Sequence, residues 1–192
     1  MFVNMNVLKR LVKAAFKNNS LMIGNVEDSL IISTGHVTVQ VLDGFATNSY
    51  KALIMEYLGE LPKIGEVYSI GGGAGNQATV GFEEELDIYT KVPLSLPKLQ
   101  RTAVRIGTWV IFQDAALNKY GVEEGLWKLY DPSEADQEKE GFPGMPQLMK
   151  DKSGILLRND GMALKIRVYE QLNSTAFREM ALIDLGEEDD WE

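Results

Sequence analysis

The stretch that most constrains the fold is residues 80–92, where apolar side chains recur at alternate positions. Charged and polar residues occupy most of the positions between them. A period of two is typical of a strand with one buried face and one solvated face. We therefore predict a long core strand here, with one face formed by Val80, Phe82, Glu84, Leu86, Ile88, Thr90 and Val92.

A glycine-rich run, residues 71–76, leads into this stretch. Residues 73–78 match the dinucleotide fingerprint G-x-G-x-x-A, in which a pyrophosphate sits at the N-terminus of the following helix. That fingerprint requires a helix directly after the glycines, whereas the alternation predicts a strand. We therefore interpret the run as a loop between strands and expect no cofactor.

The sequence patterns in most of the remaining chain also predict strands. Residues 6–18 are the clearest exception, because an apolar stripe of period 3.6 predicts an amphipathic helix that Asn4 or Asn6 can cap. A short helix is expected at residues 114–120, and residues 49–61 fit either a helix or a buried strand. Short turns are expected at Gly35-His36 and at Asn159-Asp160-Gly161. The other predicted strands are residues 21–24, 30–34, 37–42, 67–70, 104–112, 126–130, 155–158, 162–170 and 177–185.

These elements predict a mainly β fold of the α+β class. We expect about ten mostly antiparallel strands in a sandwich or two abutting sheets, with one N-terminal amphipathic helix. Whether the Pro- and Gly-containing charged segment 131–152 separates two domains stays open. The expected parts are a β-rich domain (1–130), a charged loop or linker (131–152), a terminal β-hairpin region on the same core (153–185) and a disordered acidic tail (186–192).

Composition excludes several chemistries. The absence of cysteine excludes disulfides, thiolate zinc sites and thiol nucleophiles. The only histidine, His36, falls at a predicted turn, so neither a catalytic triad nor a metal site is expected. No apolar run approaches the roughly 20 residues that span a bilayer, and residues 1–4 do not resemble a secretory signal. We expect a cytoplasmic protein that does not enter membranes.

Charge is unevenly distributed along the chain. The net charge is -9, yet residues 1–26 contain no acid, and residues 184–192 contain no base. The basic residues of the first segment are Lys9, Arg10, Lys13 and Lys17. Their helical spacing predicts a cationic helix face that can contact nucleic-acid phosphates.

Other side chains could complement this face. Lys98, Arg101 and Arg105 form a second, looser basic cluster, and Tyr89, Trp109 and Trp127 could stack on bases if they are exposed. The tail residues Asp189, Asp190 and Trp191 suggest a docking element for a protein partner.

Glu84 is a weak catalytic candidate. It falls on the apolar face of the predicted strand, and a buried carboxylate can act as a general acid or base. The neighbouring acids, Glu83, Glu85 and Asp87, would belong to the same carboxylate site.

The sequence thus favours a non-enzymatic binding or accessory protein, with nucleic-acid transactions as the leading context. Two alternatives stay open. One is a structural protein that assembles into homo-oligomers, such as a viral or phage component, and the other is a carboxylate-dependent enzyme.

Overall fold

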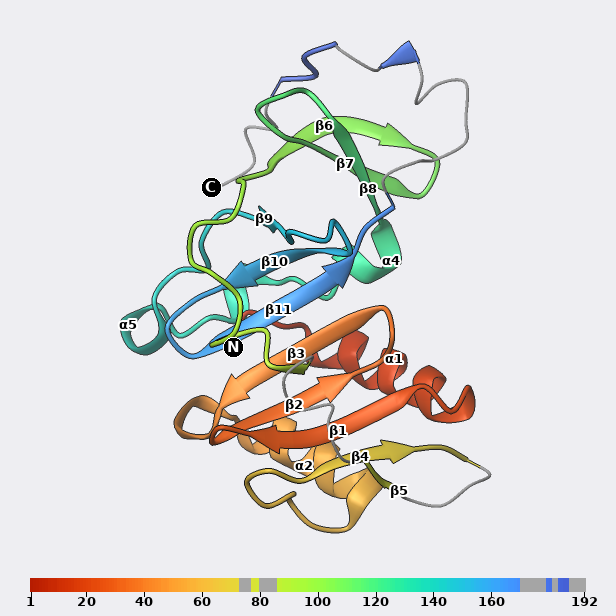
Figure 1. The fold of residues 1–192 in the computed structure, drawn as a ribbon, viewed down its shortest axis with the longest axis vertical. Helices are drawn as coiled ribbons and strands as arrows, with labels where there is room; N and C mark the ends of the chain where they lie inside the picture. The colour runs from red at the N-terminus through yellow and green to blue at the C-terminus, as the bar shows by residue number, and fades with distance from the viewer. Residues whose placement is uncertain (73–76, 80–85, 170–178, 181–182, 187–192) are drawn as a thin grey trace.

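The computed structural model describes residues 1–72, 77–79, 86–169, 179–180 and 183–186. Within these residues the strands form two antiparallel sheets (Figure 1). In spatial order the large sheet contains β5 (Gln77–Thr79), β4 (Val67–Ile70), β1 (Leu21–Val26), β2 (Ser29–Ser33), β3 (Val37–Leu42), β11 (Met162–Arg167), β10 (Gly154–Arg158) and β9 (Gln147–Leu148). The small sheet contains β6 (Gln100–Ile106), β7 (Trp109–Gln113) and β8 (Lys119–Glu123). The predicted mainly β architecture with two sheets and an N-terminal helix is confirmed.

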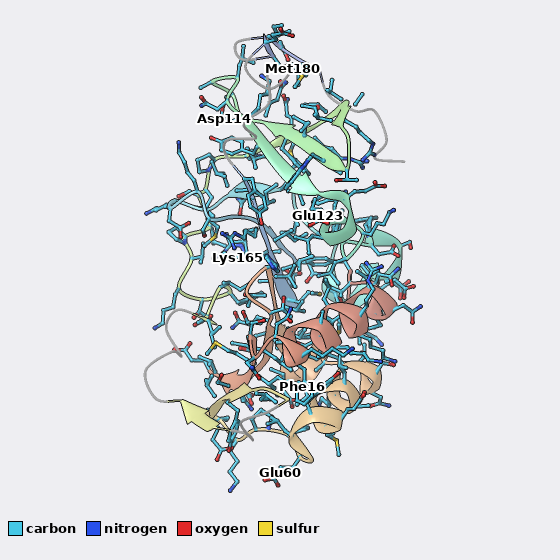
Figure 2. The ribbon with its side chains drawn as sticks, turned by 90° about the vertical axis from the view of Figure 1, so that its right-hand side faces the viewer. Phe16, Glu60, Asp114, Glu123, Lys165 and Met180 are labelled. Carbon is cyan, nitrogen blue, oxygen red and sulfur yellow. The ribbon has the colours of Figure 1, made fainter. Side chains whose placement is uncertain are left out.

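Two helices, α1 (Met5–Lys17) and α2 (Asn48–Leu58), cover one face of the large sheet (Figure 2). Their buried side chains join those of the sheet and of the small sheet in one hydrophobic core. The hydroxyl of Tyr50, at the start of α2, donates to the backbone oxygens of Leu30 and Val39 at 3.3 and 2.9 Å. The other helical segments among the described residues are short: η1 (Asp43–Phe45), α4 (Glu124–Trp127), η2 (Pro132–Glu134) and α5 (Gln137–Glu140).

Local signals explain the ends of both long helices. Asn4 caps α1, because its side-chain oxygen accepts from the backbone nitrogens of Asn6 and Val7 at 3.1 and 3.2 Å. The ambiguous stretch 49–61 is the helix α2, which ends at Gly59 with φ +85°. In the described ranges no helix is long and apolar enough to cross a bilayer.

Two predicted hairpin turns are confirmed. Gly35, with φ +76°, lies in the turn between β2 and β3, and Asp160-Gly161 lies in the turn between β10 and β11. The second hairpin adds to the first through an antiparallel pairing of β11 with β3. As a result, segments more than 100 residues apart share one sheet, and Lys165 lies opposite Thr38.

The predicted core strand is wrong for residues 86–92, which we call the cover segment. These residues form turns on the sheet face opposite α1 and α2, while residues 80–85 lie outside the described part of the chain. Leu86 and Ile88 are buried in separate small apolar clusters, and Asp87 between them is buried as well. The side-chain oxygen of Gln40 on β3 accepts hydrogen bonds from the backbone nitrogens of Ile88 and Tyr89. These two backbone groups therefore have partners without pairing to a neighbouring strand.

Four further predictions fail in or near the small sheet. Residues 104–112 are split by a turn at Gly107, with φ +59°, into β6 and β7. Residues 114–120 hold a turn instead of a helix, because the Asp114 carboxylate accepts from the backbone nitrogens of Ala116 and Asn118. Residues 126–130 begin in the helix α4 instead of a strand. Of residues 177–185, those described are not in a strand.

Candidate nucleic-acid interface

The four cations predicted to contact phosphate lie on the solvent face of α1. The helix buries Leu8, Val12 and Ala15 against the sheet, so the opposite side of each turn faces water. We call this set the α1 basic stripe: Lys9, Arg10, Lys13 and Lys17, all exposed. The structure therefore places all four predicted cations of this helix on one exposed face.

The charge of the α1 basic stripe is not compensated locally. Within the described residues, no carboxylate oxygen lies within the 4.0 Å ion-pair distance of these four side chains. Some lysines elsewhere do have such partners: Lys51 lies 2.8 Å from Asp43 and Lys128 lies 3.1 Å from Glu124. The stripe is thus available to an external anion without breaking an ion pair.

The spacing of the stripe suits an extended polyanion. Residues four apart on a helix are separated by about 6 Å along its axis, so Lys9 to Lys17 spans about 12 Å. One strand of duplex DNA advances roughly 3.4 Å per phosphate, so three or four phosphates fit along this length. Flexible lysine side chains can follow the backbone without reading bases.

The second basic cluster does not extend the stripe. Lys98, Arg101 and Arg105 lie on or next to β6 in the small sheet, and α2 lies at the other end of the molecule with α1 between them (Figure 1). The Arg101 guanidinium lies 5.9 Å from the centre of the Trp127 ring. The second cluster therefore lies on a different element from the α1 basic stripe.

The three aromatic residues considered for base stacking contact other groups of the protein. Trp127 is buried, with its ring edge-on to Phe112 at 4.9 Å between centroids. Trp109 makes a similar contact with Tyr169 at 5.0 Å. The Tyr89 hydroxyl donates to the Asp160 backbone oxygen at 2.8 Å. None of these three described rings forms an open stacking platform next to α1.

Some predicted site residues lie outside the described part of the chain. These are Glu84 and the tail residues Asp189, Asp190 and Trp191. Of the glycine-rich run, residues 73–76 are likewise not described. The segment that follows is the strand β5, antiparallel to β4, whereas the dinucleotide fingerprint requires a helix within a parallel unit.

Two cations that the sequence analysis did not select, Lys165 and Arg167, lie near His36 on the opposite face of the large sheet. The sequence does indicate that these two side chains point to the same face, since they alternate with the buried Leu164 and Ile166 on β11. Their neighbours on other strands could not be read from this pattern. No group of three or more potential metal ligands occurs among the residues that the structure describes.

Comparisons with protein-family models, with curated proteins and with solved structures find no match for this chain, so the case for a function comes from its own residues and their geometry.

Proposed function

We propose that this is a non-enzymatic accessory protein that binds nucleic acid through the α1 basic stripe. The observation that carries the proposal is the row of four exposed cations on one helix face, without an ion-pair partner among the described residues. The net charge of -9 does not oppose it, because Coulomb interactions in salt are local on the scale of about 10 Å.

The expected binding is independent of base sequence. Three of the four cations are lysines, whose ammonium groups act as point charges toward phosphate and do not distinguish one base from another. Affinity should therefore depend on salt and on strand geometry more than on sequence.

Fluorescence anisotropy with labelled single- and double-stranded 20-mers at about 50 mM salt tests this proposal. The variant Lys9→Ala/Lys13→Ala/Lys17→Ala should lose most of the binding, while alanine preserves the helix. A matched control, Lys63→Ala/Lys139→Ala/Lys150→Ala, changes the net charge equally (-9 - 3 = -12) at exposed lysines outside α1. Equal affinity of both triple variants, or no binding by the unmodified protein, would contradict the proposal.

A protein partner recruited by the tail is a second part of this proposal, and its support is the sequence alone. Acidic residues around Trp191 suit a partner with a basic, apolar pocket. Removal of residues 186–192 should leave nucleic-acid affinity unreduced while abolishing capture of such a partner.

Self-association is a second candidate function, supported by exposed apolar side chains beside β9. Leu94 is 84% exposed and Met145 is 40% exposed, and both line a shallow cavity of about 290 Å³. Light scattering coupled to size exclusion should show an oligomer that Leu94→Lys dissociates. A monomer at high protein concentration would argue against this candidate.

A further inference from the structure

A separate cavity of about 500 Å³ lies on the face of the large sheet opposite α1 and α2, beside the turn between β2 and β3. Its floor is a row of side chains that the strand register places next to one another. This row consists of Met22, Ser33, Thr38 and Lys165, from four neighbouring strands. A volume of this size is within the usual range for small-molecule sites.

The cavity is next to the cover segment, which occupies the neighbouring row of the same sheet face. Gln40 lies two residues beyond Thr38 on β3. Its side-chain oxygen accepts hydrogen bonds from the backbone nitrogens of Ile88 and Tyr89 at 2.8 and 2.9 Å. Leu86 forms the wall between the covered row and the cavity. The fold thus fixes one boundary of the cavity by hydrogen bonds.

Two cations from β11 border the cavity. Lys165 is partly exposed, and the aliphatic part of its side chain packs over Gly154 on β10. A Cβ atom added to Gly154 would lie 3.0 Å from the Cε atom of Lys165. The Arg167 guanidinium lies 5.3 Å from the centre of the Tyr169 ring. Since they are two residues apart on one strand, both project from the same face of the sheet.

A pair of hydroxyls adds a hydrogen-bond donor. Ser33 Oγ and Thr38 Oγ1 lie 3.0 Å apart on the cavity floor, and both residues are at least nine-tenths buried. Two hydroxyls contain two O–H donors, and the bond between them uses one. The other donor is free to bond an oxygen inside the cavity.

The acid Asp151 lies close to one of these cations, Lys165, but does not line the cavity. None of the described lining residues carries a carboxylate. Asp151 lies close enough to Lys165 for the positive charge to act on it. Burial raises the pKa of Asp151, but bonds from Ser153 and the charge of Lys165 lower it by more. The Asp151 carboxylate also accepts from the Ser153 backbone nitrogen at 3.0 Å.

We propose that this cavity binds a phosphomonoester that carries an apolar group. Two cations and a hydroxyl donor match a dianionic phosphate better than a singly charged carboxylate. Met22, Leu86 and Val168 provide the apolar walls for the rest of the molecule. The inference does not depend on the α1 basic stripe, which lies on the other side of the sheet.

Isothermal titration calorimetry with 1-naphthyl phosphate tests the site, with circular dichroism to verify that each variant is folded. Lys165→Met and Arg167→Met should each raise the Kd about 10- to 100-fold, because each removes a charge-assisted contact. Thr38→Val, which removes a hydroxyl without changing charge, should raise it about 2- to 10-fold. Lys150→Met, at an exposed lysine that does not line the cavity, is the matched control.

The ligand analogues separate the parts of the proposal. Inorganic phosphate should bind more weakly than 1-naphthyl phosphate because it lacks the apolar group, and 1-naphthol should bind more weakly because it lacks the anion. Binding of 1-naphthoate as tight as that of 1-naphthyl phosphate would overturn the assignment to phosphate. No binding of 1-naphthyl phosphate, or equal affinity in Lys165→Met, Arg167→Met and the control, would overturn the site. Unchanged naphthyl phosphate affinity in the α1 triple variant would confirm that the two sites are independent.

Discussion

Gln40 Nε2 donates a 2.9 Å hydrogen bond to Asp87 Oδ1, across 47 positions of sequence and at the centre of the large sheet. The same nitrogen donates to Ser29 Oγ at 2.7 Å, and Oε1 accepts from the backbone nitrogens of Ile88 and Tyr89. Every polar atom of this fully buried amide therefore has a partner. The Gln40 side chain thus connects the cover segment to the large sheet by hydrogen bonds.

Replacement of Gln40 by leucine should destabilise the protein strongly. It would remove four hydrogen bonds at a buried site, to Ser29, to the Asp87 carboxylate and to two backbone nitrogens, for a loss of about 3 kcal/mol or more in the free energy of unfolding. Urea unfolding followed by tryptophan fluorescence measures this. Gln100→Leu, at an exposed position on β6, should change stability by less than about 0.5 kcal/mol. Equal stabilities of the two variants would contradict the role of Gln40.

The stability that Asp87 provides should depend on pH. Burial raises the pKa of Asp87, but hydrogen bonds from Thr90 and Gln40 lower it by more, so that the net pKa is below its usual 3.8. A lowered pKa in the folded state means that the ionised form stabilises the fold. This contribution is complete above the unfolded-state pKa and disappears as the pH falls through the folded-state pKa.

Asp87→Asn removes this titration. The difference in unfolding free energy between the unmodified protein and Asp87→Asn should be constant near neutral pH and should shrink below about pH 4. Urea unfolding at a series of pH values measures the difference. Parallel curves down to pH 2.5 would show that Asp87 has no linked titration.

Nucleic-acid affinity should follow a defined salt dependence. Four phosphate contacts predict a slope of log K against log salt of about -3.6 for duplex DNA and about -2.8 for single strands. Between 50 and 200 mM salt the duplex affinity should fall on the order of 100-fold. The α1 triple variant retains only Arg10 of the stripe, so its slope should approach about -0.9. An unchanged slope in this variant would place the phosphate contacts elsewhere on the protein.

The Asn4 cap should matter for α1 and Asn6 should not. Asn4→Ala removes the acceptor for two backbone donors of the first turn and should cost about 1 kcal/mol, whereas Asn4→Asp keeps an acceptor there. Asn6→Ala is the matched control, because the exposed Asn6 side chain does not cap the helix. Chemical denaturation of the three variants distinguishes these effects. A larger loss in Asn6→Ala than in Asn4→Ala would contradict the assigned cap.

The features that local sequence predicts are those that depend on few neighbours. A cap, a period of 3.6 and an asparagine exit define α1, and so the whole α1 basic stripe can be predicted from one contiguous segment. Two-residue turns define the hairpins at Gly35 and Gly161 for the same reason. The side-chain chemistry of these turns is local.

The cover segment shows where such reasoning fails. Alternating apolar residues predict a strand, but Leu86 and Ile88 alternate because each packs into a different cluster of the sheet face. Asp87 was assigned to the solvated side, yet it is buried, because Gln40 and Thr90 donate hydrogen bonds to its carboxylate. Hydrogen bonds to the distant Gln40 side chain here take the place of the backbone bonds to a neighbouring strand that the alternating pattern implied.

By itself the sequence determined the antiparallel β class, the helix α1 and its cationic face, because these follow from residues within a few positions of one another. Only the tertiary structure decided that β11 lies beside β3, which places Lys165 next to Thr38 and forms the second cavity. Strand order depends on how distant hairpins bury their apolar faces together, and alternation along one strand does not specify its neighbour.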